Sequence, residues 1–180
     1  DEDLIEKTLE CAHKSAVEWS EVAIKERTGL LFKVAELIRE RRADLTSIMM
    51  METGKHLIEA DVEISEAIDF CEYYGRNALK WYAKEQFNLK SKGPILVTPP
   101  WNFPFAIPLG GVAASLVTGN PVIFKPAPEA VLTGRAAAQI FYDAGVSKSV
   151  LQFIVCEDNP FGSMLVKDER VKGCILTGAT

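Results

Sequence analysis

Four short apolar runs in the second half of this chain constrain its fold more than any other feature. They span 94–98, 121–124, 150–155 and 171–176, and polar and apolar residues scarcely alternate within them. Such runs are typical of strands that are buried on both faces, as in a parallel sheet. The second half is therefore expected to form a sheet whose two faces are both covered.

Helical patterns separate these runs, at 107–117, at 132–144 before Gly145, and at about 159–166. A strand–helix–strand unit repeated along the chain implies right-handed crossovers and an open sheet. The expected fold class is α/β, with N-terminal helices followed by part of an open, parallel, Rossmann-like sheet.

The first half has the apolar spacing of amphipathic helices. One stripe predicts a helix over about 2–26, and a second predicts a helix over 30–53, interrupted only by the charged run 39–42. Gly54 is expected to end that helix in a left-handed conformation. A third stripe predicts a helix over 57–81.

The opposite face of this third helix carries carboxylates, at Glu59, Glu63, Glu66 and Asp69. A metal cluster would need these groups to converge on one point. Helical phase instead places them away from the apolar stripe, so the sequence predicts a solvated acidic face.

The change of pattern divides the chain into two expected parts. Residues 1–92 form an N-terminal helical part, residues 93–180 form the first strand–helix–strand units of a nucleotide-binding domain, and 85–92 is the plausible joint. The chain begins without methionine, which suits a piece of a longer protein.

Composition narrows the class of protein. With 48% hydrophobic and 25% charged residues the chain is globular, and its net charge of −5 offers no basic field for nucleic acid. The cysteines are scattered without a CxxC pair, as expected of free thiols in a reducing compartment. No secretory leader or membrane-length apolar run is recognisable, so we expect a cytoplasmic protein without a transmembrane segment.

Polar residues follow the predicted strands, where open parallel sheets bind ligands. Asn102 lies in a turn stiffened by flanking prolines, so its amide could donate to an oxygen that becomes negative during attack on a carbonyl. The alternative is that Asn102 caps the next helix. Lys125 ends the second run and could bind ribose hydroxyls or a 2′-phosphate, or simply extend into solvent from a strand end.

The motifs around these residues resemble the aldehyde dehydrogenase superfamily. The resemblance rests on Pro-Trp-Asn-Phe-Pro at 100–104, on Phe-Lys-Pro at 124–126 and on Glu-Thr-Gly-Lys at 52–55. Segments 99–108 and 168–173 look most like the 1-pyrroline-5-carboxylate dehydrogenases, including the dehydrogenase module of bifunctional proline-utilisation flavoenzymes. These enzymes oxidise glutamate γ-semialdehyde to glutamate.

The resemblance implies a site. Asn102 would be the side-chain donor of the oxyanion hole, and the cofactor would be NAD, with NADP left open. FAD would be confined to a separate proline dehydrogenase module, if the parent protein has one. The residues implied in cofactor binding are Thr98, Pro99, Pro100, Trp101, Lys125, Ala127, Pro128, Glu129, Gly162, Gly178 and Ala179.

The chain departs from the family pattern at three of its strand ends. Pro128 stands where NAD-preferring relatives often carry a glutamate, with Glu129 one step later. Asp158 replaces a common glycine, whereas Gly162 keeps its expected place. Ala179 replaces a common serine and has no hydroxyl to donate.

No cysteine of this chain lies in the Gly-Gln-x-Cys setting of the family's nucleophile, and neither histidine suggests metal or acid–base work. The resemblance therefore implies that the nucleophile, the general-base glutamate and the catalytic domain lie outside these residues, and we expect no dehydrogenase activity from the isolated chain. The parent would act on a small-molecule aldehyde and form a homo-oligomer. Two alternatives stay open: an acyl-phosphate or acyl-thioester reductase of the same fold, and a non-catalytic module that binds nucleotide or only packs against partners.

Overall fold

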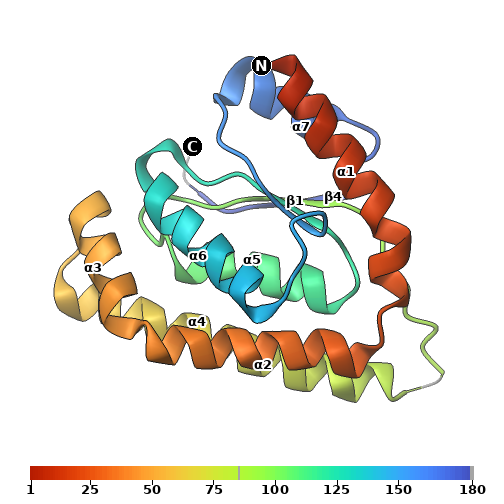
Figure 1. The fold of residues 1–180 in the computed structure, drawn as a ribbon, viewed down its shortest axis with the longest axis horizontal. Helices are drawn as coiled ribbons and strands as arrows, with labels where there is room; N and C mark the ends of the chain where they lie inside the picture. Colours follow the sequence, from red (N-terminus) through yellow and green to blue (C-terminus); the bar gives the residue numbers. More distant parts are fainter. Residues whose placement is uncertain (85, 179–180) are drawn as a thin grey trace.

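The computed structural model describes residues 1–84 and 86–178 (Figure 1). All four predicted strands are present, each within its apolar run and slightly shorter than it. They form one sheet in the order β3-β2-β1-β4. Their bounds are Ile95–Thr98 for β1, Val122–Phe124 for β2, Leu151–Phe153 for β3 and Gly173–Leu176 for β4.

The sheet is parallel throughout, as predicted. Successive side chains of β1 enter different cores: Ile95 and Val97 belong to the larger apolar cluster, and Leu96 belongs to the smaller one. The central strands are therefore apolar at consecutive positions because each side chain meets a covered face.

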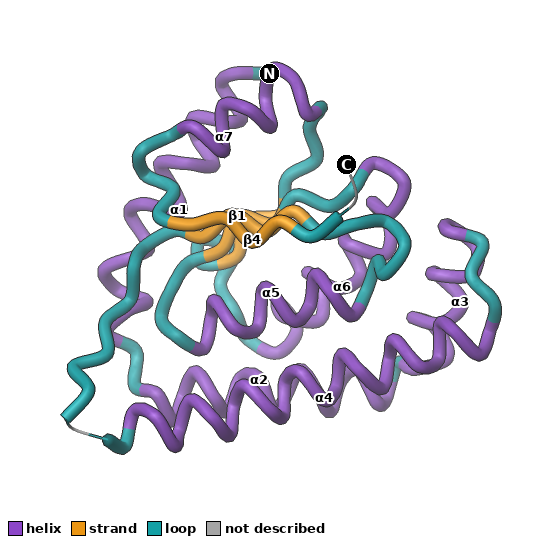
Figure 2. The backbone as a smooth tube through the Cα atoms, turned by 180° about the vertical axis from the view of Figure 1, so that it is seen from behind, coloured by secondary structure: helices purple, strands orange, loops and turns teal. Residues whose placement is uncertain are grey.

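Helices cover both faces of the sheet (Figure 1 and Figure 2). One face carries α5 (Ala106–Val117) and α6 (Val131–Ala144), and the other carries α1 (Glu2–Glu21) and α7 (Ser163–Lys167). A further layer, formed by α2 (Ile24–Glu40) and α4 (Leu57–Tyr82), packs against α5.

Three shorter helical segments complete the described elements. The helix α3 (Arg42–Thr53) packs against α4 and α6. A single turn, η1 (Pro128–Ala130), leads into α6, and η2 (Asp158–Gly162) leads into α7. Both turns begin just beyond the carboxyl end of a strand, so they border the edge where a ligand is expected.

Two of the predicted N-terminal helices have different bounds. The helix expected over 2–26 ends at Glu21, because Val22 and Ala23 take extended ψ angles of 130° and 139°. The helix expected over 30–53 is interrupted more sharply than a charged run alone implies, since α2 and α3 meet at Arg41. Apolar periodicity reports which side chains are buried, and it continues across a corner at which the helix axis changes direction.

The helix predicted over about 159–166 is confirmed only in part, because Asn159 is non-helical and the regular helix α7 begins at Ser163. The other helix predictions are confirmed. Gly54 ends α3 with φ of 72°, in the left-handed region that glycine adopts without strain. The third helix, α4, runs over Leu57–Tyr82. Gly145 likewise follows α6, with φ of 112°.

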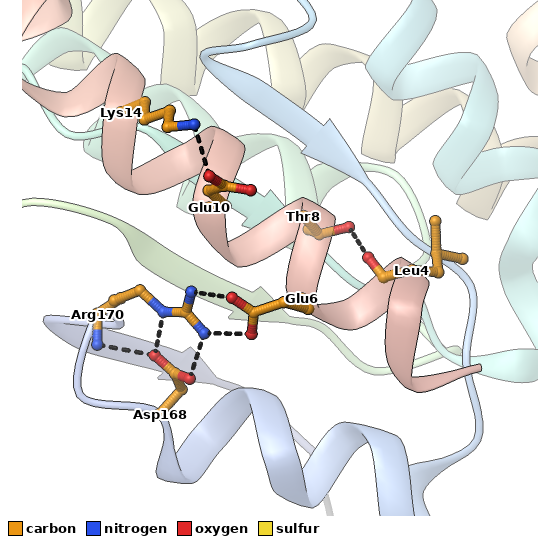
Figure 3. Close-up of polar contacts among 7 residues, drawn as sticks. All are labelled: Leu4, Glu6, Thr8, Glu10, Lys14, Asp168 and Arg170. Atoms are coloured by element: carbon orange, nitrogen blue, oxygen red, sulfur yellow. Dashed lines mark hydrogen bonds and ion pairs between the residues drawn. The ribbon is translucent and has the colours of Figure 1, made fainter.

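A charged triad fastens α1 to the segment that enters β4 (Figure 3). Arg170 donates to both carboxylate oxygens of Glu6, at 2.6 and 2.7 Å, and to both oxygens of Asp168, each at 2.8 Å. The hydrogen bonds from Arg170 lower the pKa of Asp168 to about 2. The same residues therefore fix the entry into β4 relative to α1.

Within the described residues β4 pairs only with β1, so it is an edge strand of the sheet. Its last side chain, Leu176, is 76% exposed. None of the helices in the described part of the chain combines the length and apolar character needed to cross a membrane.

Candidate functional site

A cavity of about 830 Å³ opens where the carboxyl ends of β1, β2 and β4 meet. Sheets of this topology bind ligands at this edge, and the volume is within the range of small-molecule sites. The lining residues are Thr98, Pro99, Pro100, Trp101, Asn102, Phe103, Ile107, Lys125, Pro126, Ala127, Pro128, Glu129, Asp158, Leu176, Thr177 and Gly178.

This cavity brings together most of the residues that the sequence singled out. Gly162 does not line it but packs behind Lys125, since a Cβ built on Gly162 would lie 3.4 Å from Cε of that lysine. Ala179 lies outside the described residues. Five further residues line the cavity without having been predicted as site residues: Phe103, Ile107, Pro126, Leu176 and Thr177. All five belong to the same strand-end segments as the predicted residues, which is the sequence signal that could have identified them.

Asn102 follows β1 and is exposed on the cavity wall. The capping alternative does not hold, because the N-cap of α5 is Phe105 and this helix has no side-chain capping hydrogen bond. The main-chain oxygen of Asn102 accepts a hydrogen bond of 2.6 Å from Lys55 Nζ. The backbone of Asn102 is thus held in place, and its amide makes no hydrogen bond with another described residue.

Lys125 stands directly after β2, where its backbone N–H donates to Val97 O at 3.0 Å. The residue is 6% exposed, and its Nζ lies 2.7 Å from Asp158 Oδ1. A lysine that simply extends into solvent would not be buried to this extent. The ammonium group instead forms part of the cavity wall, with a carboxylate beside it.

Glu63 corrects the prediction of a solvated acidic face. Glu59 and Asp69 are exposed as expected, whereas Glu63 is only 1% exposed. Its Oε2 accepts hydrogen bonds of 3.0 Å from the backbone N–H groups of Phe105 and Ala106, at the start of α5. Helical phase placed Glu63 on the side of α4 opposite the apolar stripe, but the start of α5 covers that position.

Lys55 completes this contact. Its Nζ lies 2.6 Å from Glu63 Oε1 in an ion pair, and 4.4 Å from the ring centroid of Phe103. Lys55 also donates to the main-chain oxygen of Asn102, so these contacts together hold the turn that carries Asn102 in place. A buried carboxylate at a helix N-terminus is also favoured by the helix dipole.

Glu52 binds the N-terminus of α6 as Glu63 binds that of α5. Its carboxylate accepts hydrogen bonds from the backbone N–H groups of Leu132 and Thr133, at 2.6 and 2.7 Å. Gly54 turns the chain between Glu52 and Lys55. The Glu-Thr-Gly-Lys segment therefore holds the N-terminus of α6 through Glu52, and the turn before α5 through Lys55.

The cysteines do not supply a reactive thiol to this cavity, since none of them is among its lining residues. Cys71 is fully buried, and burial raises the pKa of its thiol. Burial also raises the pKa of Cys156, which lies after β3. A raised pKa leaves less thiolate and lowers reactivity.

Comparison with known proteins identifies relatives of this site. The model of the aldehyde dehydrogenase family matches residues 1–180. The chain is 34% identical over 185 residues to a 1-pyrroline-5-carboxylate dehydrogenase of Staphylococcus haemolyticus, covering 97% of this chain and 36% of that protein. It is 35% identical over 176 residues to the bifunctional protein PutA of Escherichia coli, covering 98% of this chain and 13% of that protein.

Solved structures agree with this match. A 1-pyrroline-5-carboxylate dehydrogenase from Thermus with bound NAD superposes with a TM-score of 0.90 at 34% identity, over 96% of this chain and 36% of that one. A variant of proline utilization A from Bradyrhizobium japonicum gives a TM-score of 0.92 at 28% identity, over 98% of this chain and 19% of that one. The chain thus spans about a third of the single-function relatives it matches.

Proposed function

We propose that this chain, which belongs to the aldehyde dehydrogenase family, forms the cofactor-side wall of an NAD-dependent oxidoreductase that converts an aldehyde to an acid. The observation that carries the proposal is the single cavity lined by both Asn102 and Lys125. Within this proposal, residues 1–92 form a helical support, and residues 93–180 form the first units of the nucleotide-binding domain.

The residues of the cavity fit a dinucleotide. Lys125 offers N–H donors to ribose hydroxyls, and Asp158 and Glu129 offer carboxylate acceptors. Pro99 and Pro128 contribute apolar wall against which a flat ring can lie. We assign the adenosine ribose to the Lys125 side of the cavity and the nicotinamide to the side of Thr98–Asn102. When bound there, NAD supplies a hydride acceptor.

We assign Asn102 to the reacting end. Its side-chain amide can donate a hydrogen bond to the aldehyde oxygen as that oxygen gains negative charge. A donor helps most when it is already in position, because no reorganisation is then needed during the reaction. The ion pair of Lys55 with Glu63 and the bond from Lys55 to the Asn102 oxygen supply this rigidity.

The attacking thiol of the proposed reaction comes from outside the described residues, because no described cysteine lines the cavity. We propose that the water-activating carboxylate comes with it, since Glu129 and Asp158 are assigned to the ribose side of the cavity. The free state of all four cysteines suits a reducing compartment, so we propose the cytoplasm. We also propose that the full-length enzyme is a homo-oligomer. Exposed apolar side chains at the start of α4, among them Ile58 at 79% exposure, support an interface there.

The proposed substrate is glutamate γ-semialdehyde, the open form of 1-pyrroline-5-carboxylate. The printed names of the relatives from Staphylococcus haemolyticus and Thermus support this choice. If a proline dehydrogenase module accompanies the chain, as in the bifunctional relatives, that module would carry its own FAD.

The test measures NADH formation by the full-length protein with this semialdehyde. Asn102→Ala should lower kcat about 10²–10³-fold while leaving the Kd for NAD nearly unchanged, because the lost bond acts on the transition state. Asn77→Ala serves as the control and should keep full activity, because Asn77 is a half-buried residue of α4 that does not line the cavity. Absence of any semialdehyde-dependent NADH formation by the wild type would refute the proposed activity, and an unchanged kcat for Asn102→Ala would remove Asn102 from its role.

A further inference from the structure

Asp158 lines the cavity, but the proposed reaction does not itself require it. It begins η2, just beyond the carboxyl end of β3, and its side chain is 78% exposed on the cavity wall. Its Oδ1 lies 2.7 Å from Nζ of the buried Lys125. A carboxylate that is open to ligand therefore stands beside the ammonium group assigned to ribose binding.

We propose that Asp158 determines cofactor specificity, by selecting NAD over NADP at the Lys125 side of the cavity. This inference rests on the proposed NAD-binding function of the cavity and adds to it the residue that discriminates the two nucleotides. The two cofactors differ only in the phosphate on the 2′-oxygen of the adenosine ribose, so the discriminating group has to face that oxygen.

The charges on this wall favour a hydroxyl over a phosphate. Lys125 is the cation among the described residues that line the cavity, whereas Asp158 and Glu129 contribute two carboxylates. A 2′-hydroxyl can donate to the Asp158 carboxylate while it accepts from the Lys125 ammonium. A 2′-phosphate could use the ammonium, but it would bring a second anion close to Asp158, and like charges at short distance repel.

Local backbone geometry explains how Asp158 reaches this position. Ile154 N donates to Phe124 O at 3.0 Å, which keeps the chain after β3 alongside β2. Gly162 N donates to Glu157 O at 2.9 Å, and Gly162 lies against the Lys125 stem, since a Cβ built on it would be 3.4 Å from Cε of the lysine. The turn η2 is thereby packed against Lys125, with Asp158 at its cavity end.

Pro128 offers no side-chain hydrogen-bonding group to a ribose, which leaves a larger role in ribose binding to Asp158. The loop from Pro126 to Glu129 lines the cavity, and Pro128 has neither a side-chain acceptor nor a backbone N–H. A ribose hydroxyl on this side therefore has Asp158 and Glu129 as its charged acceptors. Of these two, Asp158 is the one that forms an ion pair with Lys125.

Calorimetric titration of the full-length protein with NAD and with NADP tests the inference without relying on turnover. The wild type should bind NAD more tightly, and Asp158→Asn should lower the ratio of the two affinities on the order of tenfold, chiefly by tightening NADP binding. Asp158→Ser is the second variant, because the amide introduced by the first substitution could find a new partner on the wall. The serine variant should change the ratio in the same direction.

Glu157→Gln provides the matched control. Glu157 is the exposed neighbour of Asp158, it does not line the cavity, and its substitution changes the net charge by the same amount. The ratio should stay at the wild-type value in this variant. An unchanged ratio in both Asp158 variants, or an equal change in Glu157→Gln, would overturn the inference while leaving the NAD site intact. Failure of the wild type to bind either nucleotide would refute the proposed function and the inference with it.

Discussion

Replacing Glu63 by Gln is the perturbation that most sharply tests how the turn carrying Asn102 is held. The carboxylate is 1% exposed, accepts two backbone N–H groups of α5 at 3.0 Å, and faces Lys55 at 2.6 Å. Glutamine has nearly the same shape and can still accept hydrogen bonds, but it carries no charge. The substitution thus removes the ion pair and weakens both hydrogen bonds.

The expected loss is about 3 kcal/mol. A hydrogen bond to a charged group contributes about 1 kcal/mol more than a neutral one, and two such bonds are affected here. Breaking a buried ion pair by removing one partner costs about 3–5 kcal/mol, and the 13% exposure of the Lys55 side chain places this pair at the lower end. These contributions overlap, since one carboxylate makes all of the contacts.

Amide hydrogen exchange of Phe105 and Ala106 measures this loss locally. A change of about 3 kcal/mol corresponds to exchange that is faster by roughly 100-fold, because each 1.4 kcal/mol is about a factor of ten. Glu66→Gln is the matched control, since Glu66 lies on the same helix and makes no hydrogen bond or ion pair with other described residues. It should change exchange by less than about 0.5 kcal/mol. Equal effects of the two substitutions would refute the assignment of Glu63 as the anchor of this turn.

Two further predictions concern charge and thiol chemistry. The pKa of Asp168 is lowered to about 2 by Arg170, so this pair stabilises the fold above about pH 4, and the contribution is lost as the pH falls from about 4 towards 2. In the wild type the free energy of unfolding should therefore fall by about 1 kcal/mol between these pH values, after allowance for screening by solvent. This acid-dependent loss should be absent from Arg170→Ala when urea midpoints are compared at neutral and acid pH. An acid dependence equal to that of the wild type would contradict the prediction. Cys174 is exposed and should react quickly with a thiol reagent, whereas Cys71 is buried, has a raised pKa, and should react only on unfolding. Mass spectrometry of the labelled peptides distinguishes the two cysteines. Rapid labelling of Cys71 in the folded protein would contradict its placement.

The sequence predicts the sheet well, because the burial of its strands is a local property of the apolar runs. Strand β1, for example, is apolar at three consecutive positions, and each of these residues is buried in the structure. The position of Asn102 and Lys125 on one edge follows from the same reasoning, since parallel strands place their carboxyl ends together.

The helix breaks and the anchoring contacts could not be predicted in this way. The apolar stripe of α1 continues into α2, so the corner at Val22 and Ala23 leaves no mark in the periodicity. Glu63 shows the same limit for charge. Its helical phase indicates solvent, but its partners are backbone groups of a helix 42 and 43 residues further along the chain.

The pairing of Lys125 with Asp158 also depends on tertiary structure. The two residues are 33 positions apart and belong to the ends of neighbouring strands. Residue patterns placed both at the same edge of the sheet, but only the packing of η2 against the lysine stem brings their charges to 2.7 Å.

A crystal structure of the full-length protein with NAD bound tests the central claim most directly. The account predicts the adenosine ribose beside Lys125 and Asp158, with the nicotinamide in the same cavity on the side of Asn102. A nucleotide bound at another surface, with Asn102 and Lys125 both free of contact with it, would contradict the account.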